Sequence, residues 1–560
     1  MISLGKSATS ITARQPSGQM PAEDWSMCDT MVYDTIIVGA GSAGCVLANR
    51  LSADPHRQVC LLEAGPEDRS PWIHLPVGMF FMMRSKTLNW RYQTVPQTQL
   101  HDRRLFWPRG KTLGGSSSSN AMVYTRGHRW DYDHWAALGN RGWSYAELLP
   151  LFKRAEHQER GPSAYHGVDG PLNVADLRQQ GEISRVFVRA AGQAGYPLND
   201  DFNGAEQEGV GFYQVTQKDG QRCSSARAYL HPIRQRPNLT VLTHALASRI
   251  LFEGKQAVGV AYLDRSDQTV ELRARREVVL AGGAINSPQL LLLSGVGPRA
   301  ELEQHGIPVR HELPGVGQNL QDHLDVIVAH RDLRRASYGF ALSFLPRLIQ
   351  GVADYVRHRR GFLTSNLAEA GGFVKTDPAQ PLPNIQYHLT ATILDDHGRR
   401  IWHGYGYSLH ACDLRPKSRG VLTLNSADPR DPPLLQPNYL SHPDDLDTLL
   451  AAVKSCRKIL AAPAFDGYRG EELFPGAAVQ SDDELREFIR RRAETIYHPV
   501  GTCKMGHDPL AVVDDHLRVR GLSGLWVADA SIMPTLIGGN TNAPTIVIGE
   551  KATEFILAER

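Results

Sequence analysis

The 560-residue sequence contains few cysteines, no long apolar run and no excess of either charge. Its 7 cysteines are odd in number and far apart, and none belongs to a Cys-x-x-Cys motif. That pattern argues against a disulfide framework or a zinc site, so we expect no metal centre and a reducing compartment, the cytoplasm. No segment approaches the roughly 20 consecutive apolar residues of a membrane-spanning helix. The 61 basic and 59 acidic residues leave a net charge of +2, which gives no field for binding nucleic acid.

The rest of the composition is typical of a large globular protein. Hydrophobic residues make up 42% of the chain and charged residues 21%, which excludes wholesale disorder. The chain is too long for one compact core, so we expect two structural units whose segments can alternate along the sequence. Residues 1–31 are rich in Ser, Thr, Gln, Gly and Pro and lack the apolar stretch of about 7 to 15 residues that a secretory signal needs. We expect them to form a disordered tail outside the fold.

A dinucleotide-binding pattern begins directly after this tail. Residues 32–38 are apolar and β-branched, which predicts a buried strand, and they run into the turn Gly39-Ala40-Gly41-Ser42-Ala43-Gly44. Residues 45–51 suit an amphipathic helix, and residues 58–62 suit a second strand that ends at Glu63. A Gly-x-Gly-x-x-Gly sequence alone is weak evidence, but here the strand, helix, second strand and acid follow in the required order.

Each part of this pattern has a physical role. The first glycine permits a tight turn, the second lets the backbone approach a pyrophosphate, and the third lets helix and strand pack closely. The helix N-terminus offers free amides and partial positive charge to phosphates. Glu63 lies 19 positions after Gly44 and can accept hydrogen bonds from a ribose diol. Its negative charge would repel a 2′-phosphate, which disfavours NADP.

Two further glycine-rich segments predict additional walls of a cofactor site. Residues 108–120 begin with a basic run, end in a Gly/Ser stretch and lead into the apolar residues 121–124. Such a segment can be a flexible linker, but the polar-to-apolar junction favours a loop that packs against a cofactor. Residues 277–280 indicate a strand, followed by a small-residue turn at 281–288 and a helix at 289–293. This order is expected where a parallel sheet meets a ligand.

With these segments the sequence resembles the glucose–methanol–choline (GMC) oxidoreductases, a family of FAD-dependent enzymes. The resemblance covers the chain after Met31 and rests on six motifs in the family's order. They are residues 39–44, 114–120, 283–288, 314–323 and 497–503, and residues 527–531 together with 539–545. The chain looks most like bacterial dehydrogenases of aliphatic primary alcohols or polyethylene glycol, with choline dehydrogenases next.

The resemblance implies an α/β fold with two domains. A Rossmann-like FAD-binding domain would combine residues 32–160, 226–320 and 495–560. An α+β substrate-binding domain of sheet and helices would combine residues 161–225 and 321–494 and would cover the reacting face of the flavin.

The family's motifs also assign the cofactor site. The ADP half of FAD would be held by Gly39, Gly41, Gly44 and Glu63, with Ser42, Ala43 and Ala64 beside them. The pyrophosphate or the isoalloxazine would lie near Gly114, Gly115, Ser116, Asn120, Ala121, Asp529, Ala530, Asn540 and Thr541. Some members hold FAD covalently through a histidine just before the asparagine of the second segment. Ser119 stands at that position here, so we expect FAD to be bound without a covalent link.

Two residues near the C-terminus are the predicted catalytic pair. Pro499 restricts His498 towards an extended backbone, and the family resemblance places His498 beside Asn542, facing flavin N5. An aliphatic alcohol has a pKa of about 16, roughly nine units above pH 7, so a base must take the hydroxyl proton as the hydride leaves. Neutral His498 suits that role. The amide of Asn542 can donate a hydrogen bond to the oxygen but cannot act as a base.

Two apolar segments of the remaining chain leave alternatives open. Residues 340–349 are largely apolar and precede the basic run 357–360. We favour a core helix with a solvated basic end over a surface that docks on an anionic membrane. Residues 77–84, rich in Met and Phe, can pack in the core or form a lid over an apolar substrate channel. Peripheral membrane contact would suit a dehydrogenase that passes electrons to a quinone.

The predicted function is therefore oxidation of a primary aliphatic alcohol to an aldehyde by an FAD-dependent dehydrogenase. Choline dehydrogenase and an oxygen-using alcohol oxidase of the same family are the alternatives. A flavin photoenzyme of the same family is disfavoured, because such an enzyme needs neither a base such as His498 nor a partner such as Asn542. A nicotinamide-dependent dehydrogenase, or a flavin-binding scaffold without redox chemistry, fits the motifs less well.

Overall fold

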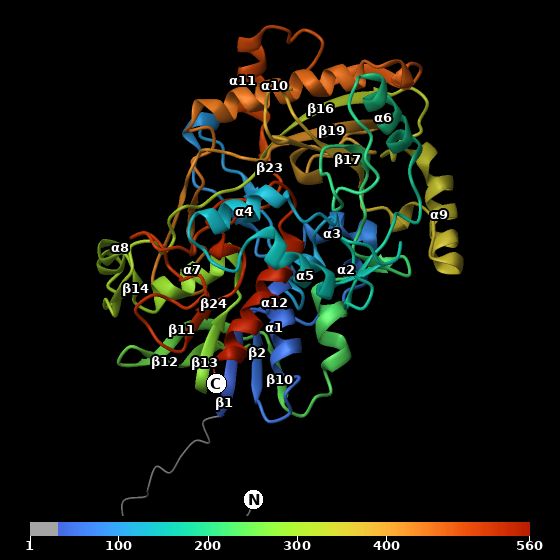
Figure 1. Cartoon of the computed structure of the whole chain (residues 1–560). Coiled ribbons are helices and arrows are strands. Elements are labelled where there is room, and N and C mark those ends of the chain that lie inside the picture. The colour runs from blue at the N-terminus through green and yellow to red at the C-terminus, as the bar shows by residue number, and fades with distance from the viewer. Residues whose placement is uncertain (1–31, 560) are drawn as a thin grey trace, which may run out of the picture.

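A sheet assembled from distant parts of the chain forms the lower half of the molecule in Figure 1. The computed structural model describes residues 32–559. Five strands run parallel in the order β10, β2, β1, β13 and β24, and β12 and β11 extend the sheet antiparallel from β13. The strands are β1 (Val32–Val38), β2 (Val59–Glu63), β10 (Leu239–Thr243), β11 (Leu246–Glu253), β12 (Gln256–Leu263), β13 (Thr269–Leu280) and β24 (Leu525–Val527).

Burial on both faces explains the composition of the central strands. The last four residues of β1 are all buried, as expected for a parallel strand that is covered on both sides. The helices α1 (Ser42–Leu51) and α12 (Asn542–Ala558) pack against each other beside this strand. Their close approach requires Gly549, where a Cβ would lie 3.0 Å from the carbonyl oxygen of Ala43. An ion pair between Arg50 and the buried Glu550, 2.8 Å long, links the two helices.

A second sheet, antiparallel throughout, lies above the first in Figure 1. Its strands follow the order β22, β16, β19, β18, β17 and β7, and β23 also pairs with β16. The helices α6 (Glu182–Gln193) and α10 (Pro443–Leu460) pack against it. The strands are β7 (Gly209–Phe212), β16 (Leu324–Asp332), β17 (Ala368–Val374), β18 (Ile385–Thr390), β19 (Gly406–Asp413), β22 (Arg469–Phe474) and β23 (Glu494–Thr495).

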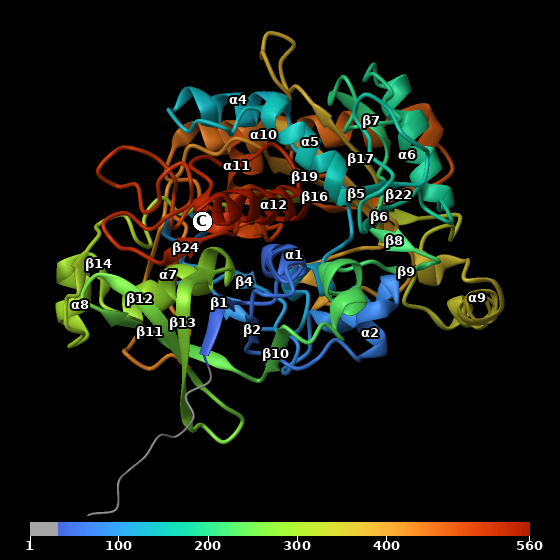
Figure 2. The same cartoon turned by 60° about the horizontal axis from the view of Figure 1, so that its bottom comes forward.

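The remaining elements connect or flank the two sheets (Figure 2). The helices are α2 (Pro71–His74), α3 (Met79–Met82), α4 (Arg129–Ala137), α5 (Tyr145–Ala155), α7 (Gly283–Leu293), α8 (Arg299–Gln304), α9 (Leu345–His358) and α11 (Asp482–Arg492). The short strands are β3 (Tyr92–Gln93), β4 (Phe106–Trp107), β5 (Glu156–Gln158), β6 (Leu172–Val174), β8 (Gln217–Lys218), β9 (Gln221–Arg222), β14 (Val296–Gly297), β15 (His311–Glu312), β20 (Val421–Thr423) and β21 (Leu434–Gln436). Among residues 32–559, no helix has both the length and the apolar character needed to cross a membrane.

The structure confirms the predicted α/β class, and the strands of its two sheets interleave along the sequence. The strand predicted at residues 32–38 is β1, and the next helix and strand lie within three residues of their predicted positions. α7 begins at Gly283 and contains Pro288, so the small-residue turn before it is shorter than predicted. The predicted domain boundaries stay predictions, and the predicted tail at residues 1–31 lies outside the described residues.

The prediction of a core helix from residues 340–349 is wrong. α9 begins only at Leu345, and Leu342, Leu345 and Ile349 are exposed. Helical spacing of apolar residues shows that a helix has an apolar face, but it does not show which neighbour that face meets. α9 is instead buried through Gly351 and Tyr355.

Candidate active site

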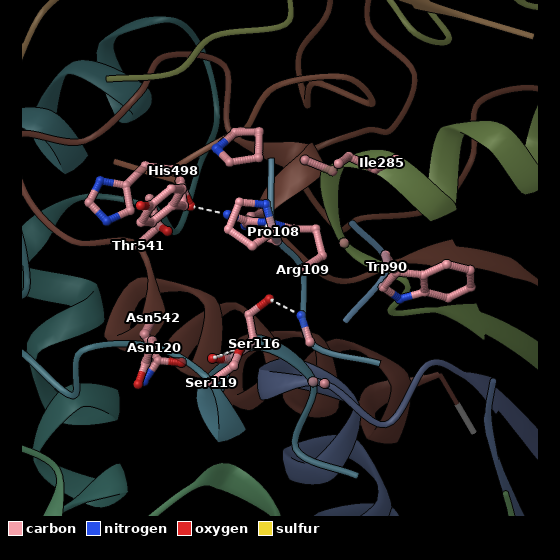
Figure 3. Close-up of a pocket in the computed structure, with 18 of the residues that line it drawn as sticks. Trp90, Pro108, Arg109, Ser116, Ser119, Asn120, Ile285, His498, Thr541 and Asn542 are labelled. Carbon is pink, nitrogen blue, oxygen red and sulfur yellow. Dashed lines mark hydrogen bonds between the residues drawn. The ribbon is translucent and has the colours of Figure 1, made fainter. Parts of the chain in front are cut away.

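A pocket of about 350 Å³ lies between the parallel and the antiparallel sheet, and Figure 3 shows some of the residues that line it. One wall consists of the turns that follow β1, β2 and β13, and the other comes from the strands β16, β17, β18 and β19. Open α/β sheets bind their ligands at this position, beyond the carboxyl ends of parallel strands.

The turn after β1 allows a ligand to approach the backbone closely. Gly39 has a φ of +102°, and a Cβ there would lie 2.6 Å from the carbonyl oxygen of Ala281. A Cβ on Gly44 would overlap the carbonyl oxygen of Gly39, so the third glycine lets α1 start directly against the strand. Gly41 and the first residues of α1 line the pocket, where the helix N-terminus offers free amides to an anion.

The second glycine segment closes over this turn and is not a linker. Gly115 has a φ of +53°, and a Cβ there would lie 2.8 Å from the Cα of Gly41. The amide of Gly114 donates to the carbonyl oxygen of Ala40 at 2.7 Å. The two glycine loops therefore form one continuous wall of the pocket.

Asn120, at the end of this segment, turns its amide nitrogen to the pocket. Its Oδ1 accepts hydrogen bonds from the N–H of Met122 at 3.0 Å and from Nη1 of Arg222 at 2.7 Å. Because both lone pairs of the oxygen are used, the hydrogens on Nδ2 remain to serve a bound acceptor.

Arg222 was not predicted to belong to the site. Its buried guanidinium donates to the carbonyl oxygens of Ile73 and Ser117 and to Asn120, none of which carries a charge. Burial lowers the pKa of this arginine to about 9. A buried cation without a counter-charge favours an anionic group in the adjoining pocket. No sequence motif indicates that Arg222 supports the pocket. The packing of β9 behind the second glycine segment shows it.

Glu63 ends β2 and faces the pocket. Its Oε2 accepts from the N–H of Ala40 at 3.1 Å, and its Oε1 accepts from the N–H of Gly65 at 2.8 Å. Burial raises the pKa of this carboxyl group to about 7 despite these bonds. An acid at the tip of the second strand is placed to bind a ribose diol.

Asp529 joins the C-terminal segment to the turn after β13. Its Oδ2 accepts from the N–H of Gly283 at 2.8 Å and from the hydroxyl of Ser287 at 2.6 Å. Its Oδ1 accepts from the N–H of Ser531 at 2.8 Å. The carboxylate therefore holds the start of α7 in place, in addition to lining the pocket.

The structure gathers nearly all predicted site residues around this one pocket. Those that line it are Gly39, Gly41, Ser42, Ala43, Glu63, Ala64, Gly115, Ser116, Asn120, Ala121, His498, Asp529, Ala530, Asn540, Thr541 and Asn542. Gly44 and Gly114 lie behind the wall and support it. Lining residues that the sequence analysis did not assign include Trp90, Arg109, Asn286, Asp325, His388 and His410.

His498 is held from both sides by hydrogen bonds. Its backbone N–H donates to Asp322 Oδ1 at 2.7 Å. Its Nδ1 lies 2.9 Å from Nδ1 of His323, and its Nε2 lies 3.2 Å from Nδ2 of Asn540. Burial, reinforced by the neighbouring His323, lowers the pKa of His498 well below 6.5.

These contacts determine which nitrogen of His498 carries the proton. Nε2 of His323 lies 3.2 Å from the carbonyl oxygen of Leu414, which can only accept, so this nitrogen is protonated. Burial lowers the pKa of His323 to about 3, so the ring is neutral and its Nδ1 accepts from Nδ1–H of His498. Asn540 Oδ1 accepts from Gln386 at 2.9 Å, so Asn540 Nδ2 donates to Nε2 of His498. That Nε2 therefore holds a lone pair at the pocket wall.

The asparagine that hydrogen-bonds His498 is Asn540, and the pairing of His498 with Asn542 in catalysis stays a prediction. Asn542 is the first residue of α12, and its Oδ1 accepts from the hydroxyl of Ser42 at 2.8 Å. Figure 3 shows His498 and Asn542 on the same side of the pocket, with Thr541 between them in this view. The two asparagines make different contacts because one ends a loop and the other begins a helix.

Strands of the antiparallel sheet supply the opposite wall. Asp325 and Ile327 on β16, and His388 and Thr390 on β18, are two residues apart and therefore face the same side of the sheet. On β19, His410 Nδ1 lies 2.6 Å from Asp325 Oδ2. This wall could not be predicted, because the sequence does not show which strands are neighbours.

The chemistry of the pocket fits a flavin dinucleotide. The N-terminus of α1 and the Nδ2 donor of Asn120 suit a pyrophosphate, and Arg222 holds Asn120 in this orientation from behind the wall. The acid of Glu63 suits a ribose diol. The glycine turns leave room for a ligand that lies against the backbone.

Comparison with known proteins identifies the family. GMC oxidoreductase models match residues 33–325 and 416–549. The chain is 57% identical to an alcohol dehydrogenase (acceptor) of Pseudomonas putida, over 94% of this chain and 96% of that one. It is 46% identical to the mitochondrial choline dehydrogenase of Homo sapiens, over 94% and 89%. Pyridoxine 4-oxidase from Mesorbium loti superposes with a TM-score of 0.85 at 32% identity, over 94% of this chain and 100% of that one. The predicted family is thus confirmed, and the chain belongs to the GMC oxidoreductases, which are FAD enzymes.

Proposed function

We propose that the chain oxidises a primary aliphatic alcohol to the aldehyde. The observation that carries this proposal is the 2.9 Å contact between Nδ1 of His498 and Nδ1 of His323, which leaves Nε2 of His498 as the accepting nitrogen at the pocket wall. FAD, when bound, supplies the acceptor for the hydride that leaves the alcohol carbon. Relatives named as alcohol and choline dehydrogenases support oxidation of a CH–OH group.

His498 takes the hydroxyl proton in this proposal. The alcohol, with a pKa of about 16, is too weak an acid to release its proton without a base. The lowered pKa of His498 keeps the ring neutral, and hence able to accept, at neutral and mildly acidic pH. The proton binds at Nε2 while Nδ1–H keeps its bond to His323, so the ring does not need to turn during the reaction.

The two asparagines have separate roles in the proposal. Asn540 donates to Nε2 of His498 at 3.2 Å, and the substrate hydroxyl replaces this contact when it approaches the base. Asn542 has its Oδ1 engaged by Ser42, so its Nδ2 is the atom that donates a hydrogen bond to the alcohol oxygen. That bond becomes stronger as negative charge builds on the oxygen.

The charges around the pocket favour an uncharged alcohol over choline. Asp325 is bonded to His410, and Asp395 lies 2.7 Å from Arg492. The ring of Trp90, which lines the pocket, is covered by Lys111 Nζ at 4.4 Å. A quaternary ammonium group is bound by aromatic faces and carboxylates, and each of these three side chains already has a partner, apart from one oxygen of Asp325.

Choline is the second candidate because of one atom. Oδ1 of Asp325 is buried without a hydrogen-bond partner in the described chain, and Asp325 lines the pocket. A cationic substrate would compensate this oxygen.

The proposed electron acceptor is a quinone, reached by peripheral contact with the inner face of the cytoplasmic membrane. The name of the Pseudomonas putida relative includes the word acceptor without saying which acceptor is used. This name supports a dehydrogenase over an oxygen-using oxidase. The proposed linkage of FAD is non-covalent, because Ser119 lines the pocket where covalent members of the family have a histidine.

Anaerobic mixing with a medium-chain alkanol should bleach the visible absorbance of the bound flavin faster than mixing with choline or a glycol polymer at equal concentration. Stopped-flow absorbance measures the three rates. Fastest bleaching by choline would select the second candidate, and no bleaching by any of them would contradict the proposal.

Acid precipitation of the holoenzyme should leave the yellow chromophore in the supernatant, because Ser119 offers no histidyl link to the flavin. The absorbance of supernatant and pellet measures the partition. A yellow pellet that survives washing would show a covalent bond.

Substitution His498→Ala should lower the rate of flavin reduction by about 10²-fold or more, because the base is removed. Bound FAD, measured by its visible spectrum, should remain. His56→Ala is the matched control, since that histidine is exposed and outside the pocket. Near-normal reduction in His498→Ala would mean that another group takes the proton.

The rate of flavin reduction should stay constant as the pH falls through about 6.5, the ordinary pKa of histidine. Because the pKa of His498 is lowered, its neutral form persists below that value, and the rate should fall only at more acidic pH. Stopped-flow reduction over a pH series measures the profile. A decline centred near the ordinary histidine pKa would be incompatible with the buried base.

A further inference from the structure

The apolar stripe of α9 faces away from the protein. Leu345, Leu348, Ile349, Val352 and Val356 recur at helical spacing and are all exposed, with Ile349 at 62% and Val356 at 70%. An amphipathic helix of a globular protein normally turns such a stripe towards the core. In Figures 1 and 2, α9 lies at the outer edge of the molecule, away from both sheets.

This stripe continues into a row of aromatic rings. Phe340, just before α9, lies 5.9 Å from Phe80, measured between ring centroids. Phe80 lies 5.8 Å from Phe81, which lies 4.1 Å from Trp72. Phe340, Phe81 and Trp72 are exposed, and so is Leu342, at 93%. We call the whole set the outer apolar surface: Trp72, Phe81, Phe340, Leu342, Leu345, Leu348, Ile349, Val352 and Val356.

Cations border the outer apolar surface. Arg357, Arg359 and Arg360 are exposed at the end of α9, and none of them forms an ion pair within residues 32–559. Asp354 is the one acid on this helix. The charges of the three arginines are therefore not paired with any acid in the described chain.

A hollow of about 650 Å³ lies between the end of α9 and α2. Its lining includes Trp72, Tyr355 and Arg359, together with further cationic side chains. These are Arg69 and Arg227, of which Arg69 pairs with Glu67, and the hollow is also lined by two histidines, His74 and His231. An aromatic and basic hollow of this kind suits a phosphate group that is attached to an apolar molecule.

The outer apolar surface and the pocket share the short helix α3. Met79, the first residue of α3, and Met83, directly after its last residue, line the pocket. Phe81 on the same short helix is exposed. α3 therefore has one side in the pocket and the other side on the outer apolar surface.

From these observations we infer that the outer apolar surface docks on a bilayer containing anionic phospholipid, with the hollow beside α9 receiving a lipid phosphate. An exposed apolar stripe with a basic border is the pattern of a helix that lies in a membrane interface. A second copy of the chain would add further uncompensated positive charge to this surface and no acid to pair with it, which disfavours self-association. The inference rests on the proposed function, since a bilayer would deliver an apolar alcohol and a quinone to the side of the pocket that α3 covers.

Co-sedimentation of the holoenzyme with vesicles tests the inference. Vesicles of phosphatidylcholine with added phosphatidylglycerol should bind the protein, and pure phosphatidylcholine should bind it more weakly. Ile349→Glu should weaken binding by at least about tenfold, because it places a charge in the apolar stripe. Leu198→Glu is the matched control, since Leu198 is 61% exposed but lies outside this surface. Arg359→Gln with Arg360→Gln should remove the preference for the anionic vesicles.

The holoenzyme and each variant are also mixed anaerobically with an alkanol in the absence of lipid. The proposed docking surface and the proposed alcohol oxidation can then fail separately. Normal flavin reduction without vesicle binding would overturn the docking surface and leave the proposed function standing. Equal loss of binding in Ile349→Glu and Leu198→Glu would also overturn it. A dimer in solution that Ile349→Glu dissociates, with no vesicle binding, would show instead that this surface joins two copies of the chain.

Discussion

The hydrogen bond between the Nδ1 atoms of His323 and His498 is the constraint on which the chemistry of the pocket depends. A neutral histidine can carry its proton on either ring nitrogen. Here burial and the carbonyl of Leu414 make His323 an acceptor, and His323 in turn fixes the proton of His498 on Nδ1. The bond also joins the two halves of the molecule, since His323 directly precedes β16 of the antiparallel sheet and His498 lies in the chain that leads to β24.

The two sheets contribute different chemistry to one pocket. The parallel sheet ends in glycine turns, two of which touch at Gly41 and Gly115. These turns line the pocket and offer backbone amides to phosphates. The antiparallel sheet offers side chains at alternate positions, among them Asp325 and His388, which suit a smaller and more variable ligand. α3 completes the enclosure and carries apolar residues on both its inner and its outer side.

The sequence predicts those parts of the site that depend on neighbours along the chain. The strand before Gly39 and the acid Glu63 follow from local pattern, because a glycine turn and a buried strand have local physical causes. The hydrogen-bond partner of His498 cannot be predicted from local pattern. Whether Asn540 or Asn542 reaches the ring depends on where α12 begins. Arg222 gives no signal in the sequence, because its lack of a counter-charge arises from tertiary packing. The outward face of α9 was missed for the same reason.

The position of the proton on His498 is the most direct test of this account. Long-range ¹H–¹⁵N NMR of protein labelled at histidine distinguishes the two neutral tautomers, and the His498→Gln spectrum assigns the signals. The account predicts a protonated Nδ1 and an unprotonated Nε2 in the resting enzyme at neutral pH. A proton on Nε2, or a positively charged ring, would contradict it.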